Sequence, residues 1–74
     1  METIVEVIKV IEYLRIVKKD KGYETIDSEI IMTGKKTGNE CKVSIMIDEQ
    51  DNITVDGDLP MMNIVKEAVK DYYA

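Results

Sequence analysis

The sequence predicts an α+β fold in which a long helix is followed by three antiparallel strands and a second helix. Three observations predict it: an apolar stripe with helical spacing over residues 3–20, alternation by two over residues 41–58, and a second helical stripe beyond residue 60. Three strands joined by short turns form a meander, and the helices that flank it pack on one face of the sheet. The 74 residues are enough for one such domain, which we place at 1–74.

The clearest element is a β-hairpin over residues 41–58. Apolar residues occupy every second position of its first strand, while polar residues occupy most of the positions between them. The apolar positions are Cys41, Val43, Ile45 and Ile47, and after the turn Ile53 and Val55. Residues 48–52, Asp-Glu-Gln-Asp-Asn, favour a turn. The single cysteine therefore lies on the inner face, where we expect a small buried hydrophobe and not a reactive thiol.

The first helix is predicted over residues 3–20. Its main stripe contains Ile4, Val7, Ile11 and Leu14, with Val10 and Val17 beside it. Lysines occupy the last turn, where the helix dipole favours positive charge. Gly22 follows as the expected left-handed terminator.

Four further apolar residues of this helix lie off the main stripe. They are Val5, Ile8, Tyr13 and Ile16. A helix that is apolar over most of its circumference is covered on more than one side. In a chain this short we expect the cover to come from a partner, most simply a second copy in a symmetric dimer.

The middle of the chain predicts a connection and one strand. Residues 23–28 are interpreted as a connection in which Tyr23 and Ile26 anchor against the core. Residues 29–35 are interpreted as a strand, and residues 37–39, Thr-Gly-Asn, as its turn, with Gly38 or Asn39 at positive φ.

The last helix is predicted to start at Asp58 as N-cap, with Pro60 in its first turn. Its apolar stripe is expected to contain Met61, Ile64, Val65, Ala68 and Tyr72. With both helices on one face of the sheet, the other face is open to solvent or a partner. We expect Lys42, Ser44, Met46 and Thr54 on that open face.

Negative charge is concentrated in the hairpin turn and exit. Five acids and no base occur within residues 48–58, whereas the rest of the chain balances ten acids with ten bases, so this segment accounts for the net charge of −5. The five are Asp48, Glu49, Asp51, Asp56 and Asp58. They predict one acidic tip, which either keeps the protein in solution or binds a basic partner.

Several functional classes are disfavoured. The chain contains no histidine, which excludes Ser-His-Asp and Cys-His catalysis, so we expect no enzyme. The spacing of Asp56 and Glu67 is similar to that of a calcium loop, but Pro60 and Met61 stand where an EF-hand requires a ligand and a glycine. We therefore expect no metal or other cofactor. No membrane span or signal peptide is predicted, which favours a cytoplasmic protein.

The element order resembles that of double-stranded-RNA-binding domains. That family holds phosphates with a basic loop between its first two strands and a lysine-rich start of its last helix. The corresponding residues here are Lys35-Lys36-Thr37-Gly38 and Asp58-Leu59-Pro60-Met61-Met62-Asn63. The acid at the helix start opposes phosphate binding.

The leading hypothesis is a non-enzymatic acidic interaction module whose carboxylates imitate phosphates and occupy the basic groove of a nucleic-acid-handling protein. In size and charge the chain resembles small acidic inhibitors encoded by phages and mobile elements, including some anti-CRISPR proteins. The alternative is a degenerate duplex-RNA-binding-type domain that serves dimerisation or RNA binding.

Overall fold

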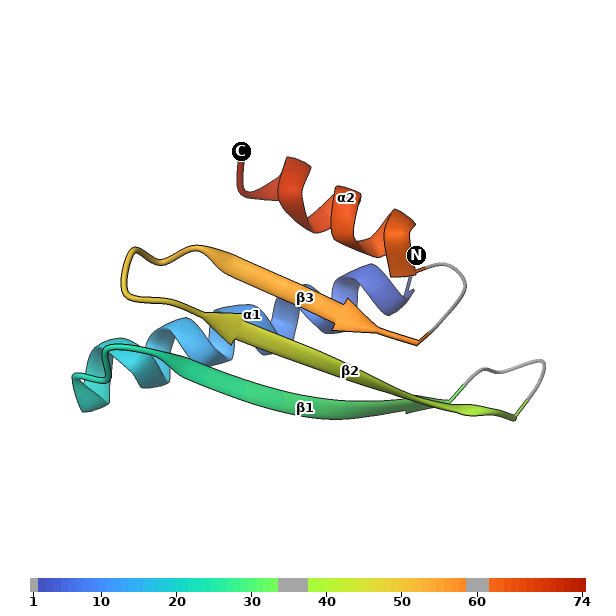
Figure 1. The fold of residues 1–74 in the computed structure, drawn as a ribbon, viewed down its shortest axis with the longest axis horizontal. Helices are drawn as coiled ribbons and strands as arrows, with labels where there is room; N and C mark the ends of the chain where they lie inside the picture. The colour runs from blue at the N-terminus through green and yellow to red at the C-terminus, as the bar shows by residue number, and fades with distance from the viewer. Residues whose placement is uncertain (1, 34–37, 59–61) are drawn as a thin grey trace.

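The fold has the predicted order of two helices and three strands (Figure 1). The computed structural model describes residues 2–33, 38–58 and 62–74. Its elements are α1 (Glu2–Lys21), β1 (Ile26–Thr33), β2 (Glu40–Ile47), β3 (Ile53–Gly57) and α2 (Met62–Tyr72). The strands form one antiparallel sheet in the order β1-β2-β3. The α+β fold predicted from the sequence is confirmed.

The hydrophobic core lies between one face of the sheet and the two helices. The alternation in β2 places Val43, Ile45 and Ile47 inward, and all three are fully buried. Val55 of β3, Cys41, and apolar residues of both helices complete the core; the helical members are Val7, Ile11, Leu14, Met62, Val65 and Val69. The opposite face of the sheet is covered by neither helix. Neither described helix has the continuous apolar length that crossing a bilayer requires.

Helix α1 ends as the sequence predicts. Gly22 has φ +69°, its N–H donates to the Lys19 carbonyl, and the Tyr23 N–H donates to the Lys18 carbonyl at 3.0 Å. This pair of bonds is a Schellman motif, in which a glycine at positive φ satisfies carbonyls at the helix end. Tyr23 is 52% exposed, so the expectation that it anchors against the core is wrong.

Strand β1 begins three residues earlier than predicted. Ile26 pairs with Ile47 and Ser28 with Ile45, so half of the predicted connection is part of the sheet. The partly buried Ile26 does pack against the core. The strand ends at Thr33, and Lys35, Lys36 and Thr37 lie outside the described residues. Gly38 has positive φ, as expected for this turn.

The β2–β3 turn is built by two aspartates. The Asp51 N–H donates to the Asp48 carbonyl and the Asp48 N–H donates to the Asn52 carbonyl, both at 3.0 Å. Asp51 has φ 63°, a left-handed conformation that the sequence did not indicate. A turn followed by a left-handed residue is a common three-residue hairpin loop, and aspartate tolerates that conformation better than most residues.

Helix α2 buries a face shifted from the predicted stripe. Met62, Val65 and Val69 are buried, whereas Ile64 and Tyr72 are 57% and 61% exposed. The expected inward position of those two residues is therefore wrong. The predicted N-terminal region of this helix, with Pro60 and Met61, lies outside the described residues, so the capping role of Asp58 stays a prediction.

Candidate functional site

The five acids of residues 48–58 do not form one tip. Asp48, Glu49 and Asp51 lie in the β2–β3 turn, whereas Asp56 and Asp58 lie at the far end of β3 (Figure 1). With a rise of about 3.4 Å per residue, Asp51 and Asp56 are about 17 Å apart along the strand. The expected single acidic cluster is corrected to two separate groups, because β3 is extended and carries its two ends apart.

Lysines neutralise one member of each group. The Lys18 Nζ lies 2.8 Å from the Asp51 Oδ1, and the Lys66 Nζ lies 3.0 Å from the Asp56 Oδ1. Both aspartates are well exposed, so these ion pairs contribute little to stability. They do reduce the local excess of negative charge that the sequence suggested.

Asp48 has a structural role in the turn. Its Oδ1 accepts the Gln50 N–H at 2.9 Å and the Asn52 N–H at 2.8 Å, and its Oδ2 accepts the Asn52 side-chain amide. The hydrogen bond from the Asn52 backbone is the main cause that lowers the pKa of Asp48 below 3.8. The pKa of Asp56 is lowered as well, chiefly by the hydrogen bond from Lys66.

Replacing Asp48 with alanine is expected to lower the free energy of unfolding at pH 7. In the variant this free energy should also decrease less as the pH is lowered. Because the carboxylate has a lower pKa in the folded chain, it contributes stability above pH 3.8 that is lost as the pH falls through the folded value. Urea unfolding at pH 7 and at progressively lower pH measures this. The control is Glu49→Ala, which removes a charge from the same turn. It should have a smaller effect than Asp48→Ala on the free energy of unfolding at pH 7 and on its dependence on pH.

The uncovered face of the sheet holds a second group of carboxylates. The strand register places Asp27 opposite Met46, and Glu29 in one row with Ser44 and Asp56. Strands are about 4.8 Å apart and alternate residues about 7 Å, so the backbone of Glu29 lies about 7 Å from that of Asp27 and about 10 Å from that of Asp56, with Ser44 and Met46 between the two edge strands. We call Asp27, Glu29, Ser44, Met46 and Asp56 the open acidic face.

The open acidic face is a shallow depression of about 410 Å³, and a lysine lies near two of its three carboxylates, Glu29 and Asp56. Lys42 approaches Glu29 only to 3.9 Å, between side chains that are both more than half exposed. Among the described residues, Asp27 has no ion-pair partner. Met46, 44% exposed, adds an apolar contact at the centre. Such a surface can bind a basic partner through both charge and apolar contact.

The sequence predicts only part of this face. Ser44, Met46, Lys42 and Thr54 were expected there and are exposed on it. Asp27 was missed because its segment was interpreted as a connection. The alternation of Ile26, Ser28, Ile30 and Met32 continues back to residue 26 and was the signal that could have extended the strand.

The extra apolar residues of α1 do not form one patch. Val5, Tyr13 and Ile16 are exposed by 50%, 66% and 61%, but Ile8 is partly buried against the core. Val5 and Ile16 lie eleven residues apart, about 16 Å along the axis. The ion pairs Glu6–Lys9 and Glu12–Arg15 occupy the intervening turns. A continuous partner surface made of these four residues is therefore not present.

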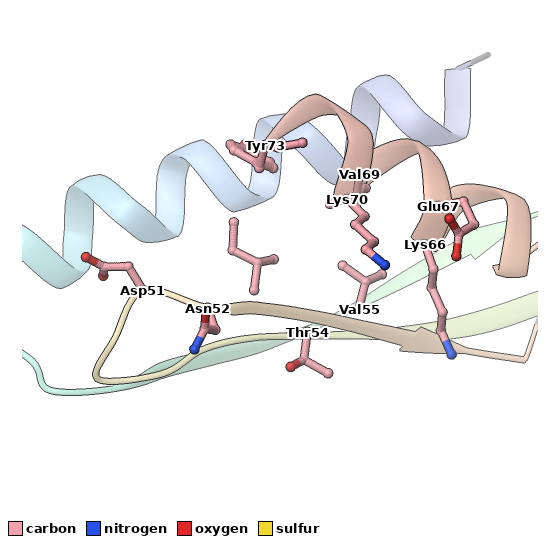
Figure 2. A pocket seen from close by; sticks show the side chains of 11 residues that line it. Asp51, Asn52, Thr54, Val55, Lys66, Glu67, Val69, Lys70 and Tyr73 are labelled. Carbon is pink, nitrogen blue, oxygen red and sulfur yellow. The ribbon is translucent and has the colours of Figure 1, made fainter.

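A groove of about 680 Å³ lies between α2 and β3. Figure 2 shows the Lys66 and Lys70 side chains extending from α2 toward β3, with Val55 beneath them. Val55 is 6% exposed although β3 is an edge strand, so α2 covers the inner face of the sheet at this strand.

Tyr73 lies at one end of the same groove. Its hydroxyl is covered and has no hydrogen-bond partner of good geometry among the described residues. Burial, and secondly the Glu12 carboxylate, raise the pKa of Tyr73. The Arg15 guanidinium lies 5.4 Å from the ring centroid, so the residue that follows α2 contacts α1.

In the described ranges 2–33, 38–58 and 62–74, no three acidic, cysteine or histidine side chains are grouped closely enough to hold a metal ion. Comparison with protein-family models, curated proteins and solved structures finds no match. Function is therefore inferred from the surface of the chain itself.

Proposed function

We propose that this chain is a non-enzymatic protein-interaction module whose open acidic face binds a basic surface of a partner protein. The observation that carries the proposal is the register that places Asp27, Glu29 and Asp56 around Ser44 and Met46 on the uncovered side of the sheet. This face is not packed, and Asp27 has no ion-pair partner among the described residues, so the face is available to a partner without any change in the fold.

The chemistry of the face selects a partner rich in lysine or arginine. Long-range attraction to a chain of net charge −5 speeds encounter, and it weakens as salt screens the charges. Met46 and the 65% exposed Ile31 then supply apolar contact beside the carboxylates. Bidentate pairing of arginine with Asp27 or Glu29 would add orientation.

The finer part of the proposal is that the partner handles nucleic acid. Carboxylates spaced about 7 Å along a strand and about 10 Å across the sheet present a regular array of negative charge. A groove that binds a phosphate backbone offers the complementary array of lysine and arginine. Inhibition of such a protein, as by small acidic phage- or mobile-element-type inhibitors, follows if the module occupies the groove. The exposed Glu49 of the turn adds to the field.

Charge reversal tests the proposal. The variant Asp27→Lys/Glu29→Lys changes two exposed residues, so it should fold normally. In affinity capture from the native cell at low salt, the amount of partner retained by this variant should be at least tenfold lower than that retained by the wild-type chain. The matched control is Asp20→Lys/Glu24→Lys, which changes the net charge equally at exposed positions outside the sheet. The control should retain the partner nearly as well as the wild-type chain.

The outcomes separate the two levels of the proposal. Equal retention by the charge-reversed variant at low salt rules out the open acidic face. A retained protein that is basic but binds no nucleic acid leaves the interaction module in place and removes the nucleic-acid part. Nuclease treatment of the extract excludes capture through a nucleic-acid bridge.

Duplex-RNA binding is the second candidate. It is favoured by the α-β-β-β-α order and by Lys66 and Lys70, which lie one turn apart on α2. It is disfavoured by the Lys66–Asp56 ion pair, which occupies one of these lysines. In a filter-binding assay at about 0.15 M salt, duplex RNA is expected not to be retained. Such binding depends on positive charges that neutralise the phosphates, and one of the two lysines is already paired with Asp56. Retention would favour this candidate over the first.

A further inference from the structure

The two edge strands of the sheet, β1 and β3, differ in how far their inward residues are covered. At the β3 edge, α2 lies beside the strand, and the inward-facing Val55 is 6% exposed. At the β1 edge, the inward residues Ile26, Ile30 and Met32 are only partly buried. The residues between them, Asp27, Glu29, Ile31 and Thr33, are exposed on the open face, as Thr54 and Asp56 are on β3. Figure 1 shows α2 beside β3, with β1 at the opposite edge of the sheet.

The phase of the hydrogen-bond ladder shows which backbone groups of β1 are open. The Asp48 N–H donates to the Asn52 carbonyl, so even-numbered residues of β2 direct their backbone to β3 and odd-numbered residues to β1. Val43 pairs with Ile30, so the backbone N–H and C=O groups of the even-numbered residues of β1 point toward β2. The N–H and C=O groups of Asp27, Glu29, Ile31 and Thr33 consequently point outward.

The hydrophobic core is also open at this edge. The inward residues of β2 are fully buried, whereas Ile26, Ile30 and Met32 of β1 are only partly buried. The adjoining flank of α1 also carries apolar residues that are not fully buried. Arg15 contacts Tyr73, the residue that follows α2, so the opposite flank of α1 lies toward β1. That flank carries the partly buried Val10 and Val17 and the exposed Tyr13.

The accessible surface of the whole chain agrees with a missing neighbour. It amounts to 5415 Å², against about 4,700 Å² for a self-sufficient monomer of this mass. The surplus of roughly 700 Å² is close to the ~800 Å² that each partner buries in an interface of standard size.

We propose that β1 pairs antiparallel with β1 of a second copy, which joins the two sheets into one of six strands. With Ile30 on the two-fold axis, Glu29 pairs with the partner's Ile31 and Asp27 with the partner's Thr33. All four outward residues of each copy then form backbone bonds, and no like charges stand directly opposite. An axis at Glu29 would instead place two carboxylates face to face, which is unfavourable.

A second copy fits this edge because the strand is complementary to itself in the Ile30 register. The same pairing covers Ile30 and Met32 of each copy with those of the other. It also places two open acidic faces side by side, although the dimer does not depend on the function proposed above.

Substitutions at Ile31 test the register. Sedimentation equilibrium of the wild-type chain is expected to show a dimer, twice the 8.5 kDa of the single chain. Ile31→Glu places a carboxylate opposite the partner's Glu29, twice per dimer, and should weaken association at least tenfold. Ile31→Lys places an ammonium there and should leave association equal or stronger. Ile64→Glu, at an exposed position on α2, is the control for net charge and should behave as wild type.

Two further measurements test the backbone pairing. Ile31→Pro removes an outward N–H without touching the bonds to β2, and edge strands tolerate this. It should keep its circular dichroism spectrum and lose at least tenfold in affinity. Hydrogen exchange at the amides of Asp27, Glu29, Ile31 and Thr33 should slow as the protein concentration rises.

Three results overturn the proposal. The first is a monomer at all concentrations up to about 0.5 mM. The second is a dimer whose affinity is unchanged by both Ile31→Glu and Ile31→Pro, since a different surface would then be used. The third is a loss in Ile64→Glu equal to that in Ile31→Glu, which would assign the effect to net charge alone.

Discussion

Replacing Ile45 with alanine is expected to lower the free energy of unfolding by about 3–4 kcal/mol. Ile45 is fully buried at the centre of β2, between Ser28 of β1 and Val55 of β3, and it belongs to the hydrophobic core. Its truncation removes apolar contacts and leaves a cavity that strands held on both sides cannot close. A chain of 74 residues has only about 4–11 kcal/mol of stability to lose.

Urea and thermal unfolding measure this effect. The midpoint of thermal unfolding should fall by roughly 12–32 °C for a domain of this size. The matched control is Met46→Ala, one residue along the same strand but on the open face and 44% exposed. It should cost less than about 1 kcal/mol. Similar losses in both variants would mean that both faces of the sheet are covered, contrary to the described packing.

Replacing Gly57 with valine is expected to cost about 2–3 kcal/mol. A Cβ at Gly57 would lie 3.1 Å from the Lys42 carbonyl oxygen and 3.4 Å from the Val43 Cγ2, and 3.0 Å from the Met62 Cε. The Met62 side chain can move, but the Lys42 carbonyl is part of the central strand. Glycine is therefore required where β3 leaves the sheet because of space, and not because of its backbone dihedral angles.

Gly22 provides the matched comparison. Nothing lies within 4 Å of a Cβ built there, but φ is +69°. Gly22→Ala should cost about 1 kcal/mol through backbone strain alone, and Gly22→Asn should recover part of it, because asparagine tolerates this conformation. At Gly57, neither alanine nor asparagine should match glycine. Recovery of stability in Gly57→Asn would contradict the steric explanation.

The sequence by itself determined the order of the elements and the inner face of the central strand. The alternation of Val43, Ile45 and Ile47 is a local pattern with period two, and only one face of a strand can hold it. Gly22 and its lysines likewise mark a helix end through local geometry. These features depend on residues that are neighbours along the chain.

Tertiary structure decided the site. Asp27, Glu29 and Asp56 come from two strands, and they share a face only because of the register with β2. The separation of Asp51 from Asp56 likewise depends on β3 being extended and not folded into the turn. In α2, adjacent apolar residues such as Ile64 and Val65 allowed two helical phases, and packing against the core selected Val65. Register, strand edges and helix phase are set by contacts between segments distant in sequence, so local patterns leave them open.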